Sequence, residues 1–251
     1  LGFELPDLLV SKRLPIGKTE IIANANRPLL KGFYDDWYRP DNMVLVLVGD
    51  FPIPLAEQLI DAQFSDLAPR ATAAAPPPIG TVNHKGLKIF HHYEPEVGGT
   101  TVSIEVIQAY DRISDSLALR HREMVEGMAD RIVQNRLDAR LKAPEAPFTA
   151  AAVGSGIYLN RIRYAEISAD SSTENWQQTL AVLEQELRRA RLYGFTEAEL
   201  SRVKKDTLKM LDNAVREAPT RNSTTLARDI IRHLAGGRVF QSPDQEKTNL
   251  A

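Results

Sequence analysis

The sequence predicts an α+β fold in which an antiparallel or mixed β-sheet is covered by helices on one face. Four strand-like segments lie in two pairs, 86–94 with 100–109 and 149–157 with 161–169. A long segment with helical periodicity, at 114–142, separates the two pairs, and further helical patterns follow the second pair. Strand pair, helix, strand pair and then helices is the order expected for a sheet with one helical layer.

Residues 1–70 combine helical patterns with one strand candidate. The segment "RPLLKGFYDDWYRP" (27–40) has apolar residues at helical spacing and ends on a proline, so it predicts a helix. The run "MVLVLVGD" (43–50) is continuously apolar until Gly49-Asp50 and predicts a strand buried on both faces. A helix over 53–66 is expected next, with four apolar side chains inward: Leu55, Leu59, Ile60 and Phe64.

A change of composition then marks a boundary between two parts of the chain. The stretch "PRATAAAPPPIG" (69–80) is rich in proline and alanine and has no apolar periodicity. Consecutive prolines favour a stiff, extended conformation. We therefore place a linker at 71–85, between a first part at 1–70 and an α+β part at 86–251.

Turn and capping residues predict how the elements of the second part connect. The two strands at 149–157 and 161–169 form a predicted hairpin around Leu159-Asn160. A helix over 176–190 should end at Gly194, and Thr196-x-x-Glu199 is a capping box for the next helix. The last helical segment is expected at 223–235. The helix at 114–142 should bury one face, formed by Leu117, Met124, Val125, Met128, Ile132 and Val133.

Composition excludes several classes of function. The net charge is −2, so nothing in the totals indicates a nucleic-acid partner. No apolar run is long enough to predict a membrane span. Cysteine is absent, which excludes disulfides, thiolate metal ligands and a cysteine nucleophile. The chain starts with Leu1 rather than Met, which suggests a piece of a longer polypeptide.

The stretch "FHHYEPE" (90–96) resembles a metal site at first sight. On a strand, neighbouring side chains point to opposite faces, so His91 and His92 cannot bind one ion together. His92 and Glu94 share a face, but a zinc site needs three or four ligands. No two of the five histidines stand four residues apart, as a helical zinc motif requires. We therefore expect no metal ligand and no catalytic residue in this chain, and interpret "FHHYE" as the start of a strand.

Two other motifs also fail to predict chemistry. The Gly-x-Gly in "AVGSGIY" (152–158) has strand-like flanks, whereas a phosphate-binding loop opens directly into a helix. No Gly-x-Ser-x-Gly occurs, so the serine-hydrolase elbow is missing.

One long stretch indicates a relationship far more specifically than these short motifs do. The segment "KRLPIGKTEII" (12–22), followed by "LLKGFYDDWYRPDNMVLVLVGDF" (29–51), resembles the pitrilysin/insulinase family of inverted-motif zinc metallopeptidases. The later "YGFTEAELSRVKKDTL" (193–208) is similar to a looser segment of the same family. The residues that match in order are Arg13, Pro15, Ile16, Gly17, Phe33, Tyr34, Trp37, Tyr38, Pro40, Asn42, Met43, Val48, Gly49 and Asp50.

The resemblance implies where the chemistry lies. The family's zinc ligands belong to a His-x-x-Glu-His motif and a later glutamate, all upstream of the segment that matches 12–22. Residues 1–70 would then be the C-terminal remnant of the zinc-bearing subdomain, and 86–251 the next, non-catalytic subdomain. Zinc would be present in the parent protein if its upstream motif is intact, and the chain itself would need no cofactor. Its partners would be a polypeptide substrate and the other subdomains, and a periplasmic location is suggested.

The resemblance also implies one binding element. In insulin-degrading relatives, a strand ending in Val-Gly-Gly pairs with the amino-terminal part of the substrate. The matching positions here are Val153, Gly154 and Ser155, where serine replaces the second glycine. Such a strand would bind polypeptide by β-augmentation. The alternative is that 151–157 is an ordinary interior strand.

Three functions follow as hypotheses. The first is the substrate-cradling, non-catalytic portion of a zinc endopeptidase. The second is a structural or partner subunit of the same fold, without peptidase activity in the parent, and the third is a stand-alone peptide-binding module. The strand at 43–50 lacks neighbours from its own subdomain, so we expect it either to self-associate into a homo-oligomer or to dock onto the second part of the chain.

Overall fold

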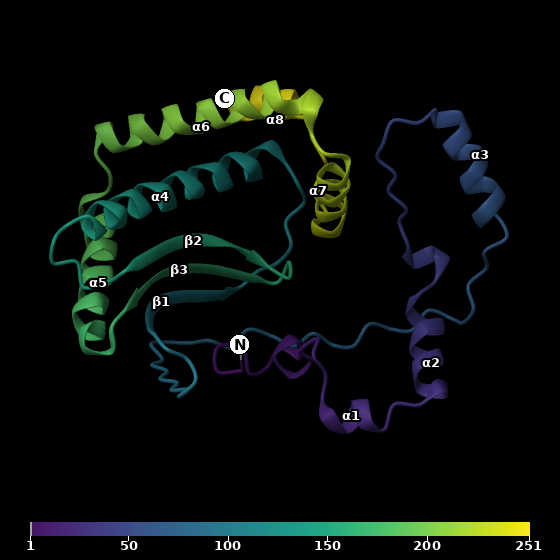
Figure 1. Cartoon of the computed structure of the whole chain (residues 1–251), viewed down its shortest axis with the longest axis horizontal. Helices are drawn as coiled ribbons and strands as arrows, with labels where there is room; N and C mark the ends of the chain where they lie inside the picture. Colours follow the sequence, from purple (N-terminus) through teal and green to yellow (C-terminus); the bar gives the residue numbers. More distant parts are fainter. Residues whose placement is uncertain (1) are drawn as a thin grey trace. The chain divides into compact units, whose positions relative to one another are not determined.

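A computed structural model describes residues 2–251. The chain divides into two compact units. The first comprises the chain as far as Thr81 together with Arg221–Ala235, and the second comprises Val82–Thr220 together with Gly236–Ala251. Figure 1 labels the helices and strands of both. The origin of residues 1–70 in a zinc-bearing subdomain stays a prediction.

Three helices of the first unit form where the sequence predicts them, whereas α1 was not predicted. Asn26 begins the helix at 27–37 by accepting a hydrogen bond from the Leu29 N–H at 3.0 Å, and Pro28 occupies its first turn. The predicted helices at 27–40, 53–66 and 223–235 are all confirmed. The elements are η1 (Leu9–Lys12), α1 (Thr19–Ala23), α2 (Arg27–Trp37), η2 (Pro40–Asn42), α3 (Ile53–Phe64) and α7 (Ser223–Gly236).

The prediction of a buried strand at 43–50 is wrong for this chain. Within residues 2–251 this segment pairs with no strand, and it has no regular secondary structure. Most of its side chains are exposed, Val44 to 74%, and only Val46 and Val48 are half-buried. The prediction that the apolar face of α3 is buried is wrong in the same way, since Leu55, Leu59 and Phe64 are each about half exposed. Apolar residues can favour a strand, but the strand exists only where another chain segment supplies hydrogen bonds.

The prediction of a strand at 86–94 is also wrong. Leu87 and Ile89 are 90% and 86% exposed, and the segment is extended without pairing to any strand in the described part of the chain. A turn follows it, in which the Val97 N–H donates to the Glu94 carbonyl at 3.0 Å. The sheet therefore begins after "FHHYE", at Thr100.

The sheet of the second unit is antiparallel and contains β1 (Thr100–Ala109), β2 (Ala150–Tyr158) and β3 (Ile162–Ser171). Its strand order is β1-β3-β2, so β3 is central and β2 lies at an edge. The predicted hairpin joins β2 to β3, with Leu159 and Asn160 both at positive φ, 54° and 55°. Two consecutive residues in this conformation make the tight turn whose twist suits a hairpin.

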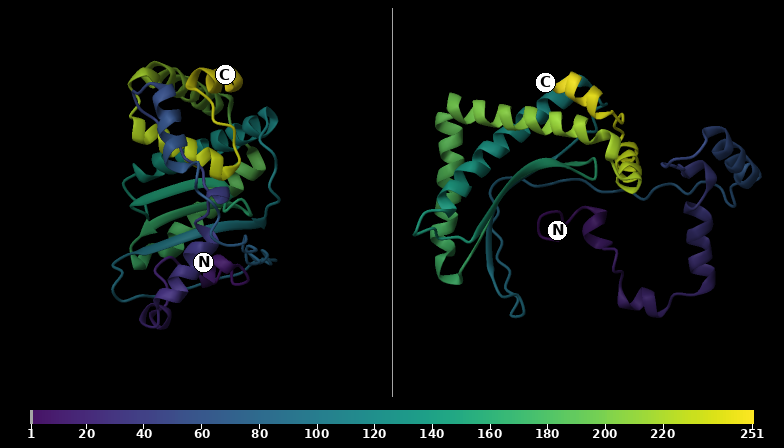
Figure 2. Two further views of the ribbon diagram at one scale, coloured as in Figure 1. Left: turned by 90° about the vertical axis from the view of Figure 1, so that its right-hand side faces the viewer. Right: turned by 45° about the horizontal axis from the view of Figure 1, so that its top comes forward.

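Helices cover one face of this sheet, as the predicted α+β fold requires. Figure 2 shows α4 (Leu117–Leu141) and α5 (Trp176–Tyr193) over the same side of the strands. The helix α6 (Glu197–Glu217) packs against α4, and η3 (Thr173–Asn175) and η4 (Ala218–Thr220) are short connections. The helix α8 (Pro243–Leu250) was not predicted, although Ser242, Pro243 and Gln245 supply its capping box and first turn.

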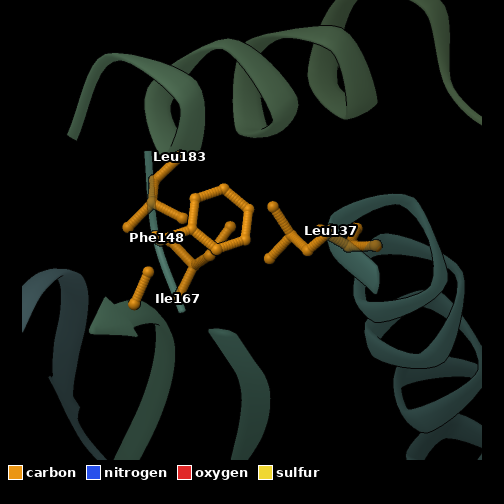
Figure 3. Close-up of a cluster of buried hydrophobic side chains, with 6 residues drawn as sticks. Leu137, Phe148, Ile167 and Leu183 are labelled. Carbon is orange, nitrogen blue, oxygen red and sulfur yellow. The ribbon is translucent and has the colours of Figure 1, made fainter. Parts of the chain in front are cut away.

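The core of the second unit lies between the sheet and these helices. Figure 3 shows Leu137 of α4, Leu183 of α5 and Ile167 of β3 converging with Phe148. Leu137 and Leu183 are completely buried. Of the face predicted for α4, Ile132 and Val133 are buried, whereas Leu117 and Val125 are at least half exposed. The strand residues that face this core in adjacent register are Val102, Ala169 and Ala151 in one row and Ile104, Ile167 and Val153 in the next.

Arg136 of α4 fastens the three long helices to one another. Its guanidinium donates two hydrogen bonds to Glu199 of α6, at 2.6 and 2.9 Å, and one to the Gly194 carbonyl at the end of α5. Glu199 also accepts from the Thr196 N–H, which completes the predicted capping box. Gly194 ends α5 at a φ of 65°, as its position after the helix predicted. The Arg136 guanidinium lowers the pKa of Glu199 to about 2.

A second ionic cluster holds the chain beyond Gly237 against the start of α4. Asp115 accepts hydrogen bonds from Arg120, from Arg238 at 3.3 Å and from the Val239 N–H at 2.9 Å. Hydrogen bonding from Arg120, chiefly, lowers the pKa of the Asp115 carboxyl far below its usual range. Gly237, at a φ of 65°, leaves no room for a side chain because a Cβ there would overlap the Arg112 guanidinium.

We expect the Glu199–Arg136 pair to make the fold acid-sensitive in a defined window. The pKa of Glu199 falls from 4.5 to about 2 on folding, so its stabilisation is complete above pH 4.5 and is lost as the pH falls towards 2. In Glu199→Gln the capping box remains but this titration disappears. The variant should be about 2 kcal/mol less stable at neutral pH, and its stability should fall less steeply in acid.

Urea unfolding at a series of pH values measures both effects. Glu184→Gln is the control, because Glu184 forms an exposed ion pair with Arg188 one helical turn away and should behave like the native chain. Equal acid slopes in Glu199→Gln and the native chain would contradict the assignment.

Candidate functional site

The candidate site is the free edge of β2, where the sequence places Val153, Gly154 and Ser155. β2 pairs with β3 alone, so its other edge is not covered by a strand in residues 2–251. The three residues lie opposite Ile167, Glu166 and Ala165 of β3. Within residues 2–251, β2 is therefore an edge strand.

The three residues alternate between the two faces of the sheet, as strand geometry requires. The Val153 side chain packs against the core that α4 and α5 cover. The Ser155 hydroxyl, on the same face, donates to the Asp130 carboxylate of α4 at 2.7 Å. Gly154 lies on the opposite face, and so does Gly156, where a Cβ would stand 3.4 Å from the Tyr164 ring. On one face of the sheet, β2 therefore presents two glycines without side chains. On the other face, its side chains contact α4.

A glutamine of α4 reaches this edge and binds its backbone. The Gln134 amide nitrogen donates to the Ala151 carbonyl at 3.0 Å, and the Gln134 amide oxygen accepts from the Val153 N–H at 2.9 Å. The same nitrogen also donates to the Asp138 carboxylate at 2.8 Å. Two acceptors and one donor surround the side chain, so only one orientation of its amide group satisfies all three.

Beyond Val153 the edge continues without a partner. Backbone groups of alternate residues point the same way along a strand, so Ser155 and Ile157 direct their N–H and carbonyl groups outward, like those that Gln134 binds. No hydrogen bond is found for these two N–H groups among residues 2–251. Such groups form the kind of edge to which an extended peptide adds as a further strand.

The sequence did not reveal that polar side chains of α4 form hydrogen bonds with β2. Asp130, Gln134 and Asp138 stand four residues apart and so share one side of α4, next to the apolar residues that enter the core. This polar stripe beside an apolar face was visible in the sequence. Its partner strand was not, because the contact joins residues that lie about twenty positions apart.

Four of the histidines belong to three different segments, with His121 on α4 and His233 on α7. His91 and His92 belong to the unpaired, exposed segment before β1. The His121 ring is hydrogen-bonded to the Asn249 carbonyl at 2.6 Å, and the His233 ring to the Asp229 carbonyl at 2.7 Å. Among the described residues no group of three or more histidine, aspartate or glutamate side chains is placed to hold a metal ion. Nor does any helix between residues 2 and 251 combine the length and the apolar character that crossing a membrane requires.

Comparison with protein families decides the relationship. Residues 24–206 match the family model described as the peptidase M16 inactive domain. The chain belongs to this family. The resemblance to pitrilysin/insulinase zinc metallopeptidases is thereby confirmed, and the M16 inactive domain is a non-catalytic part of a zinc-protease family.

Curated relatives of this M16 domain are much longer than the chain itself. It is 26% identical over 229 residues to a zinc protease PQQL-like protein of Arabidopsis thaliana, covering 89% of this chain and 20% of that protein. It is 26% identical over 238 residues to the probable zinc protease PqqL of Escherichia coli, covering 93% of this chain and 25% of that protein. The chain thus spans a quarter or less of the length of these relatives.

A solved structure shows the same fold. The crystal structure of the periplasmic protease PqqL from Escherichia coli superposes with a TM-score of 0.85 at 22% identity, covering 99% of this chain and 27% of that chain. The fold of the M16 domain described above is therefore shared with a protease of known structure.

We expect the Ser155–Asp130 hydrogen bond to stabilise the edge strand. Ser155→Ala removes the bond and leaves the Asp130 carboxylate without it, so the free energy of unfolding should fall by about 1 kcal/mol. Ser168→Ala on β3 is the matched control, since no partner for its hydroxyl is found within residues 2–251. Urea unfolding of both variants provides the measurement, and an equal loss in the two would refute a specific role for the bond.

Proposed function

We propose that this chain is the substrate-cradling, non-catalytic portion of a zinc-dependent endopeptidase that degrades or processes polypeptides. Its role is to hold an extended stretch of substrate along the β2 edge while cleavage takes place elsewhere in the parent protein. The observation that carries the proposal is the unpartnered backbone at Ser155 and Ile157, on the strand that also contains Val153 and Gly154. Main-chain hydrogen bonds of this kind bind many sequences, which suits a protease with varied substrates.

Zinc chemistry belongs, in this proposal, to parts of the parent protein outside the chain. The described residues do not fit a zinc site, because no three suitable side chains converge. The names of the curated relatives, which include zinc proteases of Arabidopsis thaliana and Escherichia coli, support zinc in the parent. The Escherichia coli structure is that of a periplasmic protease, which supports a periplasmic location here too.

Residues 1–70 belong, in the same proposal, to the end of the zinc-bearing subdomain. The exposed apolar run of Met43, Val44, Leu45 and Leu47 supports this, since such a run is stable in water only when other strands cover it. Within residues 2–251 this run belongs to no sheet. In the parent, strands of the same subdomain would pair with it, and in the isolated chain a second copy would.

The alternative function is a structural or partner subunit with no peptidase activity in the parent. The chain's own residues are compatible with both functions. Two relatives, matched over 89% and 93% of the chain, are named zinc proteases, which favours the first. An intact His-x-x-Glu-His motif upstream in the parent would support the protease, and a degraded one the structural subunit.

We expect the chain to bind extended peptides through the Ser155 backbone. The probe is a fluorescent peptide of about ten alternating valine and threonine residues, the length of a long strand. Ser155→Pro removes the outward N–H and should weaken binding about fivefold, the effect of one lost hydrogen bond. Proline is tolerated at a sheet edge, so the fold should persist.

The matched control is Ser155→Ala, which loses the same hydroxyl but keeps the N–H. It should bind the peptide as the native chain does, measured by fluorescence anisotropy, with circular dichroism to verify folding. Equal affinity of the alanine and proline variants would show that the β2 edge is not the binding element.

We expect the isolated chain to cleave no peptide in a zinc-dependent manner, because it supplies neither metal ligands nor a general base. A fluorogenic peptide assay with added zinc, and with chelator as the reference, measures this. Tight binding of one zinc ion per chain together with cleavage would overturn the proposal.

A further inference from the structure

The Gln134 side chain occupies the place of a neighbouring strand. In a sheet, each hydrogen bond between an added strand and the edge strand joins a backbone nitrogen to a carbonyl oxygen about 2.9 Å away. The Gln134 amide lies 3.0 Å from the Ala151 carbonyl oxygen and 2.9 Å from the Val153 nitrogen, with donor facing acceptor at both contacts. One carboxamide thus makes two of the hydrogen bonds that the N–H and carbonyl groups of an added strand would make.

A bound peptide and Gln134 cannot use these positions together. An N–H group forms one good hydrogen bond, and that of Val153 already donates to Gln134. The carboxamide also fills the space in which a peptide backbone would have to lie. Displacing it would break its third hydrogen bond too, to the Asp138 carboxylate of the same helix.

The remaining edge is short and has a fixed end. After Val153 the outward-facing residues are Ser155 and Ile157, and the hairpin turn at Leu159 and Asn160 follows directly. The Gln134 side chain bounds this stretch on one side and the turn bounds it on the other.

We propose that Gln134 is a register stop, a side chain that occupies the edge at Ala151 and Val153 and confines an added peptide strand to Ser155 and Ile157. This inference rests on the proposed function of the β2 edge and adds the substrate length and register that the edge accepts. A ladder of two outward-facing residues holds a peptide weakly and in a constant position, whatever its sequence.

Hydrogen exchange of the free chain tests the contact itself. In the native chain the Val153 amide should exchange slowly although it lies on the outer edge. In Gln134→Ala it should exchange about tenfold faster, as expected when one hydrogen bond to a nearby group is lost. Asn135→Ala is the matched control, because it removes a carboxamide from the adjacent position of α4, which points to a different side of the helix. Unchanged exchange at Val153 in Gln134→Ala would overturn the proposal.

Exchange in the presence of the alternating valine–threonine peptide tests the register. The peptide should newly protect only Ser155 and Ile157 in the native chain and in Asn135→Ala. In Gln134→Ala protection should extend to Val153, and the affinity should rise about fivefold. Gln134→Glu can still accept from Val153 but cannot donate to Ala151, so it should keep the Val153 amide protected in the free chain.

The two proposals fail in different ways. If the peptide binds with equal affinity to the native chain and Gln134→Ala, and displaces Gln134 in the native chain, the register stop is wrong and the binding edge survives. If the peptide protects no amide of β2 in any variant, the proposed function fails and the register stop with it. The exchange rate of Val153 in the free chain still reports separately whether Gln134 covers the edge.

Discussion

The ion pair between Arg136 and Glu199 is the contact on which the arrangement of the second unit depends. It joins α4 to the start of α6, and the same guanidinium holds the last carbonyl of α5. Because side chains occupy fixed directions around a helix, the direction of Arg136 also sets which way the neighbouring side chains of α4 point. With Arg136 directed at α6, Leu137 enters the core and Gln134 reaches the edge of β2. Packing, capping and the candidate site therefore share one constraint on α4.

The strands β2 and β3 differ in how fully their backbones are paired. The strand β3 is structural, whereas β2 has an edge to which a ligand could add. The central strand β3 has neighbours on both sides, and its residues Ile167 and Ala169 are buried. The strand β2 is supported by β3 on one side and by side chains of α4 on the other. The α4 side chains form hydrogen bonds with only a few backbone groups of the β2 edge. The N–H groups of Ser155 and Ile157 therefore stay without a hydrogen bond within residues 2–251. Membership of the M16 inactive-domain family agrees with the proposed non-catalytic role of the domain.

Sequence reasoning succeeded wherever the deciding interactions are local. Asn26, Gly194 and the pair Thr196 and Glu199 mark helix ends through contacts within a few residues, and each is found as expected. The hairpin at Leu159 and Asn160 is equally local. The strands expected at 43–50 and 86–94 depend on partners far away in sequence, and the chain provides none within residues 2–251. The position of Val153, Gly154 and Ser155 on a strand was predictable, but the role of Gln134 was not, because a helical glutamine is usually a solvated residue.

The exposed run from Met43 to Val48 has a consequence for handling the protein. It is an uninterrupted apolar hexapeptide, without charge, proline or glycine, and four of its six side chains are exposed to solvent. Segments of this composition stack into cross-β fibrils when many copies meet, since each layer satisfies the backbone of the next. Chains in which this run stays uncovered would thus carry a segment prone to amyloid formation, and molecular chaperones would have reason to recognise it.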